Sequence, residues 1–189
     1  MTQSQQTTMA QTPANANRPS SEGVDVNSTE YVTLHLGGQM FGLPIDQVHD
    51  VFIASQIASV PLAPREIVGL LNLRGRVVTA LSLRARLGMP ELEKAVSAAE
   101  DGETKDNKAK DNQPRNMAIG IEHNGEAYAL MVDKIGEVMR LESGTFEPNP
   151  IHLDPAWIAL STGVHRLDGQ LLIILDVNAV LDFDAVMAA

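Results

Sequence analysis

The side chains best suited to acid–base or metal chemistry are five histidines and two pairs of carboxylates. The pairs are Asp46 with Asp50 and Asp133 with Glu137, and they occupy equivalent places in two similar segments. That equivalence favours a structural role, such as pairing with an arginine, over general acid–base catalysis. The histidines show neither the i, i+4 spacing of a helical metal site nor an HExxH motif, so we predict no metal site and no cofactor.

Other catalytic signatures are also missing from the sequence. The chain has no cysteine, which excludes a disulfide, a thiolate metal site and a cysteine nucleophile. It contains neither a Gly-x-Ser-x-Gly elbow nor a phosphate-binding loop of the Walker type. We therefore predict that the protein is not an enzyme.

The most distinctive short motif is Asn72-Leu73-Arg74-Gly75. An arginine at the tip of a strand, just before a turn glycine, can hold a carboxylate on a neighbouring strand through its planar guanidinium. Asp50 is the candidate partner. The alternative is a surface arginine whose ion pair contributes little to stability.

These residues lie on hairpins that occur twice along the chain. Gly37-Gly38 and Asn124-Gly125 each separate two runs of alternating apolar residues, which is typical of a tight β-hairpin. The segment 41–51 matches 128–138 at an offset of 87, and 69–81 matches 163–175 at an offset of 94. Each second segment leads into a short helix, with Ser82 and Asp176 as suitable N-caps. The repeat predicts two small β-barrels side by side with a groove between them.

Composition and charge argue against further classes of function. Hydrophobic residues make up 44% of the 189-residue chain, and the formal net charge is −10. Residues 31–90 hold five basic and three acidic side chains, whereas residues 116–189 hold three basic and eleven acidic side chains. An acidic chain is poorly suited to nucleic acid, so no nucleic-acid partner is expected. No apolar run is long enough to span a bilayer and no secretory signal is recognisable, so no membrane insertion is expected.

Two segments have the composition of disordered chain. Residues 1–29 are rich in Thr, Gln, Ser and Asn, and we interpret them as a disordered tail. Residues 91–115 are interpreted as a flexible insertion, with a short helical extension at 91–99; a longer solvated helix is the alternative. The folded domain is then expected at 30–184, with subdomain one at about 30–90 and subdomain two at about 116–184.

The chain resembles the CheW family of chemotaxis coupling proteins. The motifs that carry the resemblance are Tyr31–Val51, Val60–Pro64, Gly69–Gly75, Val132-Asp133 and Ser161–Gly163. The resemblance covers about residues 30–183. It implies a mainly β fold of two intertwined five-stranded barrels of the Src-homology-3 type, with short helices and no catalytic activity.

The resemblance also implies partners. A CheW-like protein is a cytoplasmic adaptor that binds the cytoplasmic tips of chemoreceptors and the regulatory domain of the histidine kinase CheA. It is recruited to membrane-associated receptor arrays, where other CheW copies can be partners in rings. The positions that match receptor or kinase contacts are Val48, Asp50, Val51, Gly69, Asn72, Arg74, Gly75, Met117, Ile135, Val138 and Phe146. For any one of the valines, a place in the core is the alternative.

Three departures from the family pattern bear on the pathway. Asp50 stands where the family usually has glutamate, Ser82 stands where it often has aspartate, and the connection at 91–115 is longer than usual. An adaptor in a pilus or developmental pathway is therefore an alternative. A small-molecule-binding or hydrolytic barrel is the alternative from a different class.

Overall fold

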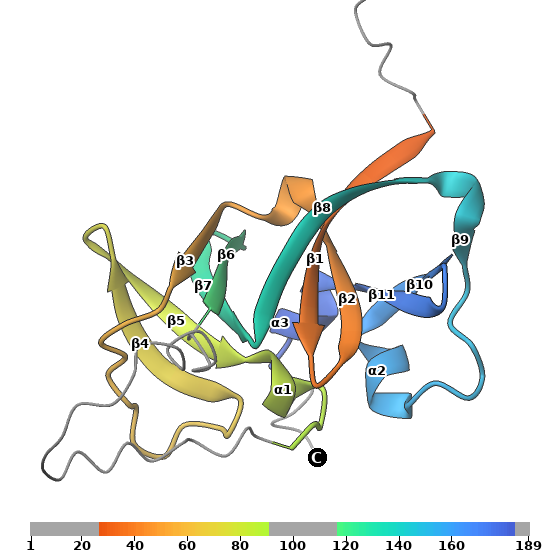
Figure 1. The fold of residues 1–189 in the computed structure, drawn as a ribbon. Coiled ribbons are helices and arrows are strands. Elements are labelled where there is room, and N and C mark those ends of the chain that lie inside the picture. The colour runs from red at the N-terminus through yellow and green to blue at the C-terminus, as the bar shows by residue number, and fades with distance from the viewer. Residues whose placement is uncertain (1–26, 91–116, 184–189) are drawn as a thin grey trace, which may run out of the picture.

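The computed structural model describes residues 27–90 and 117–183, and these form a mainly β fold (Figure 1). The first block contains β1 (Ser28–Leu36), β2 (Gln39–Pro44), η1 (Ile45–Gln47), β3 (Asp50–Ile53), β4 (Ile67–Leu73), β5 (Arg76–Ser82) and α1 (Leu83–Arg86). The second contains β6 (Met117–His123), β7 (Glu126–Val132), β8 (Lys134–Glu142), η2 (Ser143–Thr145), β9 (Phe146–Glu147), α2 (Pro155–Ala159), β10 (Ser161–Leu167), β11 (Gln170–Leu175) and α3 (Val177–Leu181).

The strands form two sheets, and each sheet takes strands from both blocks. Sheet A has the order β8-β1-β2-β11-β10-β9, and sheet B has the order β3-β6-β7-β5-β4. The two blocks are joined by the parallel pairs β2–β11 and β5–β7 and by the antiparallel pairs β1–β8 and β3–β6. In sheet B, a bridge between Ala58 and Leu70 brings the chain beyond β3 back against β4. The simple expectation that each repeat builds its own barrel is therefore wrong, while the intertwined arrangement is confirmed.

The predicted hairpins form where the turn residues allow them. Gly37 and Gly38 have φ of +56° and +88°, and Asn124 and Gly125 have φ of +52° and +81°. Turns with positive φ at both central positions match the twist of antiparallel strands, which explains the two-residue loops. The helices after β5 and β11 are also confirmed, since Ser82 and Asp176 accept hydrogen bonds from the first backbone N–H groups of α1 and α3.

The main hydrophobic core contains residues from both sheets. Its buried members include alternate residues of β1 and β6, among them Leu34, Leu36, Ile119 and Ile121. Two smaller clusters lie on the other faces of the strands, one around Ala80 and Ala129 of sheet B and one around Tyr31 and Leu172 of sheet A. Large side chains therefore face the core between the sheets, whereas sheet B carries mainly small ones on its other face.

Strand β1 differs from the expectation in two respects. The alternation of a half-buried strand would leave Tyr31 and Thr33 exposed on the face opposite Val32, but both are buried. The physical reason is that β1 pairs with β2 on one side and β8 on the other, and Thr33 donates a hydrogen bond to the backbone oxygen of Glu137. The strand also begins at Ser28, within the predicted tail. The rest of that tail and the predicted insertion at 91–115 lie outside the described residues.

Candidate functional site

Arg74 is presented at the turn of the β4–β5 hairpin. Arg74 and Gly75 occupy the two turn positions with φ of +53° and +85°. A non-glycine residue in this region costs of order 1 kcal/mol, so the turn needs support. Asn72 provides it, because its Oδ1 accepts a hydrogen bond from the Gly75 N–H at 2.8 Å. Asn72 and Gly75 therefore hold the turn that carries Arg74 into solvent.

Asp50 lies within reach of that arginine, as the sequence predicted. A guanidinium nitrogen of Arg74 lies 3.1 Å from Oδ2 of Asp50, with the two side chains 80% and 23% exposed. Asp50 is the first residue of β3 and pairs with Gly120 of β6, where a Cβ would lie only 3.3 Å from that of Asp50. The contact is a single exposed ion pair, which contributes at most about 1 kcal/mol to stability. Most donors of the guanidinium remain free for another molecule.

Gly69 allows the chain beyond β3 to approach β4 closely. Its φ is +153°, and an added Cβ would lie 2.3 Å from the Ala58 carbonyl oxygen. The backbone of Ala58 exchanges two hydrogen bonds with Leu70, each 2.8 Å long. A glycine is therefore required at position 69 for the chain beyond β3 to pair with β4. The Arg74 turn follows the other end of the same strand.

The structure separates the four matched aliphatic residues into core and surface. Val48 and Ile135, at equivalent positions of the repeat, both pack against the main core. Val51 and Val138, also equivalent, are 44% and 51% exposed. The sequence did not make this distinction, because all four are β-branched apolar residues in the matching segments Asp46–Val51 and Asp133–Val138.

Met117 and Phe146 complete the matched set. Met117 packs against the main core at the start of β6. Phe146 is partly exposed on β9, and its ring centroid lies 5.4 Å from that of the buried His165. Gly163 makes room for the ring, since a Cβ there would lie 2.3 Å from Cζ of Phe146. Ten of the eleven predicted contacts thus form two groups, with Asp50, Val51, Gly69, Asn72, Arg74, Gly75 and Met117 on sheet B, and Ile135, Val138 and Phe146 on sheet A, while Val48 lies between η1 and β3.

The sequence also matches a known protein family. The CheW-like domain family model matches residues 30–185, which is most of the chain. The chain belongs to the CheW-like domain family. The family accounts for the interleaved strands, which composition and periodicity alone did not predict.

Individual CheW relatives are distant but cover most of their own length. The chemotaxis protein CheW of Rhizobium meliloti is 22% identical over 151 residues, covering 80% of this chain and 86% of that protein. The CheW of Helicobacter pylori is 22% identical over 155 residues, covering 82% of each. The crystal structure of the scaffolding protein TtCheW from Thermoanaerobacter tengcongensis aligns with a TM-score of 0.62 and 26% identity, covering 82% of this chain and 92% of that one.

The CheW-like fold also exposes apolar residues that sequence reasoning missed. Ile53 lies two residues beyond Val51 on β3, and Val68 and Leu70 lie on β4; all three are exposed. The alternation of side chains along each strand could have predicted their exposure, because residues i and i+2 share a face. They extend the apolar surface of sheet B beyond the predicted valine.

A second ion pair, between the two blocks of the CheW-like domain, was also missed. The guanidinium of Arg84 on α1 is buried and binds both carboxylate oxygens of Asp133, at 2.6 and 2.5 Å. Asp133 also accepts a hydrogen bond from the Gly37 N–H at 2.9 Å. Burial alone would raise the pKa of Asp133, but the hydrogen bonds from Arg84 and Gly37 outweigh it and hold the pKa below its usual value.

Within residues 27–90 and 117–183, no group of three or more His, Cys, Asp or Glu side chains could hold a metal ion. No helix in those ranges is long and apolar enough to cross a membrane.

Proposed function

We propose that this chain is a non-catalytic chemotaxis adaptor that couples chemoreceptors to a CheA-type histidine kinase. Three facts support the proposal: membership of the CheW-like family, the chemotaxis names of its relatives, and a related structure titled a scaffolding protein. An adaptor needs surfaces for at least two partners and no reaction centre.

The exposed Asp50–Arg74 ion pair is the observation that carries the proposal. Arg74 has 80% of its side chain in solvent, although its turn requires a positive φ and a supporting side chain. A surface pair of this kind contributes little to folding, so its value lies in what it can contact. Arginine is one of the residue types that are enriched at the hot spots of protein-binding surfaces.

In this proposal, the two groups of surface residues make different contacts. The sheet B group, with Gly69 at its edge, serves the receptor tip and the regulatory domain of the kinase. Phe146, on sheet A, serves a second kinase contact or another CheW copy in a ring. The protein then acts in the cytoplasm at receptor arrays, and the folded unit spans 30–184.

Calorimetric titration tests this function directly. The purified chain is titrated into the regulatory domain of a CheA kinase from the same organism, and separately into a receptor cytoplasmic fragment. We expect one-to-one binding in the micromolar range, and Arg74→Glu is expected to weaken it at least about tenfold. Arg76→Glu is the matched control, because Arg76 lies in the same hairpin and makes only a 3.7 Å contact with Glu122.

Two outcomes would contradict the proposal. One is absence of binding to both partners by a well-folded sample. The other is an Arg74→Glu variant that binds both partners as tightly as the Arg76→Glu control, which would exclude the Arg74 surface as the site.

A further inference from the structure

The β6–β7 hairpin turns through Asn124 and Gly125, which form the single Asn-Gly dipeptide of the sequence. Both residues are exposed at the tip, and their φ values of +52° and +81° are those of a two-residue turn. The nitrogen that follows the asparagine belongs to glycine, which has no Cβ to obstruct an approach to that nitrogen. The tip therefore holds a side-chain amide and a backbone nitrogen that can react with each other.

The nitrogen of Gly125 is available for such a reaction. Within the part of the chain that the structure describes, no acceptor is bonded to the Gly125 N–H. At the β4–β5 turn, by contrast, the Gly75 N–H donates to Oδ1 of Asn72 at 2.8 Å. The two turns therefore differ in whether the glycine nitrogen is already engaged.

Ring closure also requires the backbone of Asn124 to rotate, and the hairpin tip allows this rotation. The last pair of the ladder is His123 with Glu126. Beyond that pair the turn has open space around it, since a Cβ built on Gly125 would meet no atom within 4 Å. Exposed ends of hairpins open locally at a small fraction of the free energy of global unfolding.

His123 lies next to the group that would leave. Nε2 of His123 is 3.0 Å from Nδ2 of Asn124. In the ground state the amide N–H donates to the neutral imidazole. After attack by the Gly125 nitrogen, the former amide nitrogen is an amine with a lone pair, and a protonated imidazole at this position can donate to it. A histidine placed in this way is a general acid.

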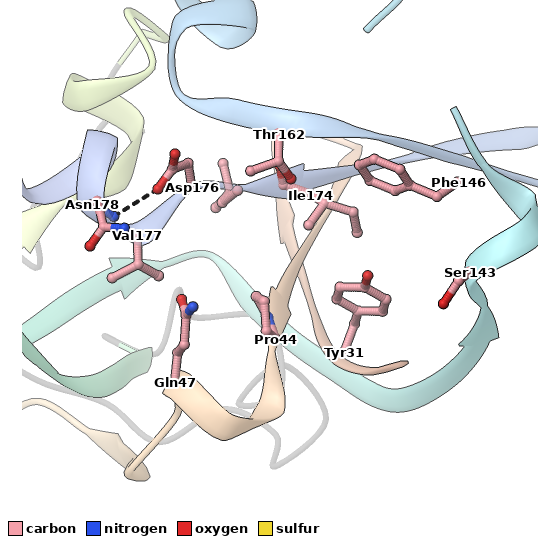
Figure 2. Close-up of a pocket in the computed structure, with 11 residues that line it drawn as sticks. Tyr31, Pro44, Gln47, Ser143, Phe146, Thr162, Ile174, Asp176, Val177 and Asn178 are labelled. Carbon is pink, nitrogen blue, oxygen red and sulfur yellow. Dashed lines mark hydrogen bonds between the residues drawn. The ribbon is translucent and has the colours of Figure 1, made fainter. Parts of the chain in front are cut away.

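Two other asparagines in the second block lack this arrangement. Asn149 precedes Pro150, which has no N–H. Asn178 precedes Ala179 at the start of α3 (Figure 2), where the Ala179 N–H donates to the capping carboxylate of Asp176 at 3.4 Å. In both cases the following nitrogen is not free to attack the side-chain amide.

Asn27 and Asn72 are the remaining asparagines of residues 27–90 and 117–183. Each precedes a residue whose side chain hinders attack, Ser28 and Leu73 respectively. Ser28 and Leu73 also belong to β1 and β4, whose pairing restrains the backbone. Asn124 is therefore the asparagine best placed to lose its amide.

We propose that Asn124 is a site of deamidation in which His123 acts as the general acid. The Gly125 nitrogen loses its proton to solvent and forms a bond to Cγ of Asn124. The Cγ–Nδ2 bond then breaks, and the nitrogen leaves as ammonia after taking a proton from His123. Water opens the resulting succinimide ring and leaves aspartate or isoaspartate at position 124, and no oxidant or reductant is consumed.

The product changes both the charge and the backbone of the tip. Its carboxylate adds a negative charge between Glu122 and Glu126, and Glu122 lies 3.7 Å from Arg76 of the neighbouring β4–β5 hairpin. Isoaspartate also adds a methylene group to the main chain, which no longer fits a two-residue turn. Older molecules therefore have a more acidic surface beside that hairpin than newly made ones.

Mass spectrometry of the full chain tests the site. The purified protein is incubated at neutral pH in H₂¹⁸O, and its proteolytic peptides are analysed at intervals, because ring opening introduces one oxygen from water. We expect Asn124 to convert first, to a labelled mixture of aspartate and isoaspartate. Asn124→Gly removes the site and keeps the turn, since the equivalent turn of the first copy is Gly37-Gly38, so its peptide should remain unlabelled.

His123→Gln tests the role of the imidazole, because glutamine can accept the same hydrogen bond but does not transfer a proton. We expect the rate of conversion at Asn124 to fall at least about threefold. His152→Gln is the matched control, since His152 is also a surface histidine but lies in the turn before α2. It should leave the rate unchanged.

Retention of the Asn124 amide over weeks at neutral pH would overturn the proposal, as would earlier conversion of Asn27. Equal rates in His123→Gln and His152→Gln would overturn it as well, because Asn124 would then react without a proton from His123.

Discussion

In the first copy of the repeat Asp50 pairs with Arg74, whereas the equivalent positions of the second copy hold Glu137 and Asp168. Two carboxylates cannot form an ion pair, so the second copy lacks this surface feature. For the equivalent carboxylates Asp46 and Asp133, the ion pair is formed in the second copy and not in the first. Asp133 in the second copy is bound by Arg84 and Gly37, while Asp46 in the first is exposed and makes no hydrogen bond or ion pair within the described residues.

The difference shows how a duplicated fold can divide its roles. The two hairpins of each copy and the capped helix that follows the second hairpin recur in both copies, because alternation and turn residues determine them. The polar side chains added to that frame differ. One ion pair lies on the surface, where it is available to partners, and the other joins α1 to the turn between β7 and β8 and so fixes one block against the other.

The largest effect is expected at the equivalent glycines Gly69 and Gly163. Gly69→Ala should lower the free energy of unfolding by about 3 kcal/mol, because the new Cβ would meet the Ala58 backbone at a φ of +153°. Gly163→Ala should cost less, about 2 kcal/mol, because Gly163 has no positive φ, although its Cβ would meet the Phe146 ring and the Glu147 carbonyl oxygen at 2.3 and 2.6 Å.

Urea unfolding measures both changes, and Gly144→Ala provides the control. Gly144 has open space around its Cβ position and no positive φ, so alanine there should change the free energy by less than about 0.5 kcal/mol. If Gly69→Ala were as stable as Gly144→Ala, the close approach that shuts sheet B would be incorrect.

The next largest effect is expected at Asp133, which is compared with Asp46 at the equivalent position of the first copy. Asp133→Ala should lower the free energy of unfolding by about 2 kcal/mol, because it leaves the buried Arg84 guanidinium and the Gly37 N–H without their acceptor. Asp46→Ala, at the equivalent position, should change it by less than about 0.5 kcal/mol. Thermal or urea unfolding of the two variants is sufficient, and equal effects would show that the copies do not differ here.

Much of this fold could be predicted from the sequence, and the reasons are local. The turns at Gly37-Gly38 and Asn124-Gly125 and the caps Ser82 and Asp176 depend on a few adjacent residues, and all are confirmed. The Asp50–Arg74 contact was also predicted, because a turn arginine reaches only a limited area.

The remaining features depend on packing between distant segments, which no local pattern encodes. Tyr31 is buried because β8 covers β1, and Arg84 meets Asp133 across 49 residues of sequence. The separation of Val48 from Val51 into core and surface depends on the same packing. Which partner contacts each surface residue remains a prediction.

A smaller, pH-dependent effect comes from the position that holds Leu71 in the first copy and His165 in the second. Both side chains are buried, and burial lowers the pKa of His165 although the hydrogen bond to Thr145 opposes the shift. A histidine with a depressed pKa is neutral in the folded state, while the unfolded chain binds a proton near pH 6.5. The free energy of unfolding should therefore decrease as pH falls from 7 to 5.

His165→Leu makes the second copy resemble the first at this position and should remove that part of the pH dependence. Urea unfolding at pH 5, 6 and 7 compares the two proteins. The difference in free energy between the variant and the wild type should change steadily in favour of the variant as the pH falls. A constant difference across this range would mean that His165 titrates alike in both states.

The smallest effect on stability is expected at the surface pair that distinguishes the first copy. Arg74→Ala removes a single exposed contact and should change the free energy of unfolding by less than about 0.5 kcal/mol, as should Arg76→Ala in the same hairpin. The two variants are then equally stable but should differ in binding, since only Arg74 lies beside Asp50 in the proposed contact. A loss of several kcal/mol in Arg74→Ala would instead make the pair structural, like that of Arg84 and Asp133, and the proposed division of roles between the two copies would no longer hold.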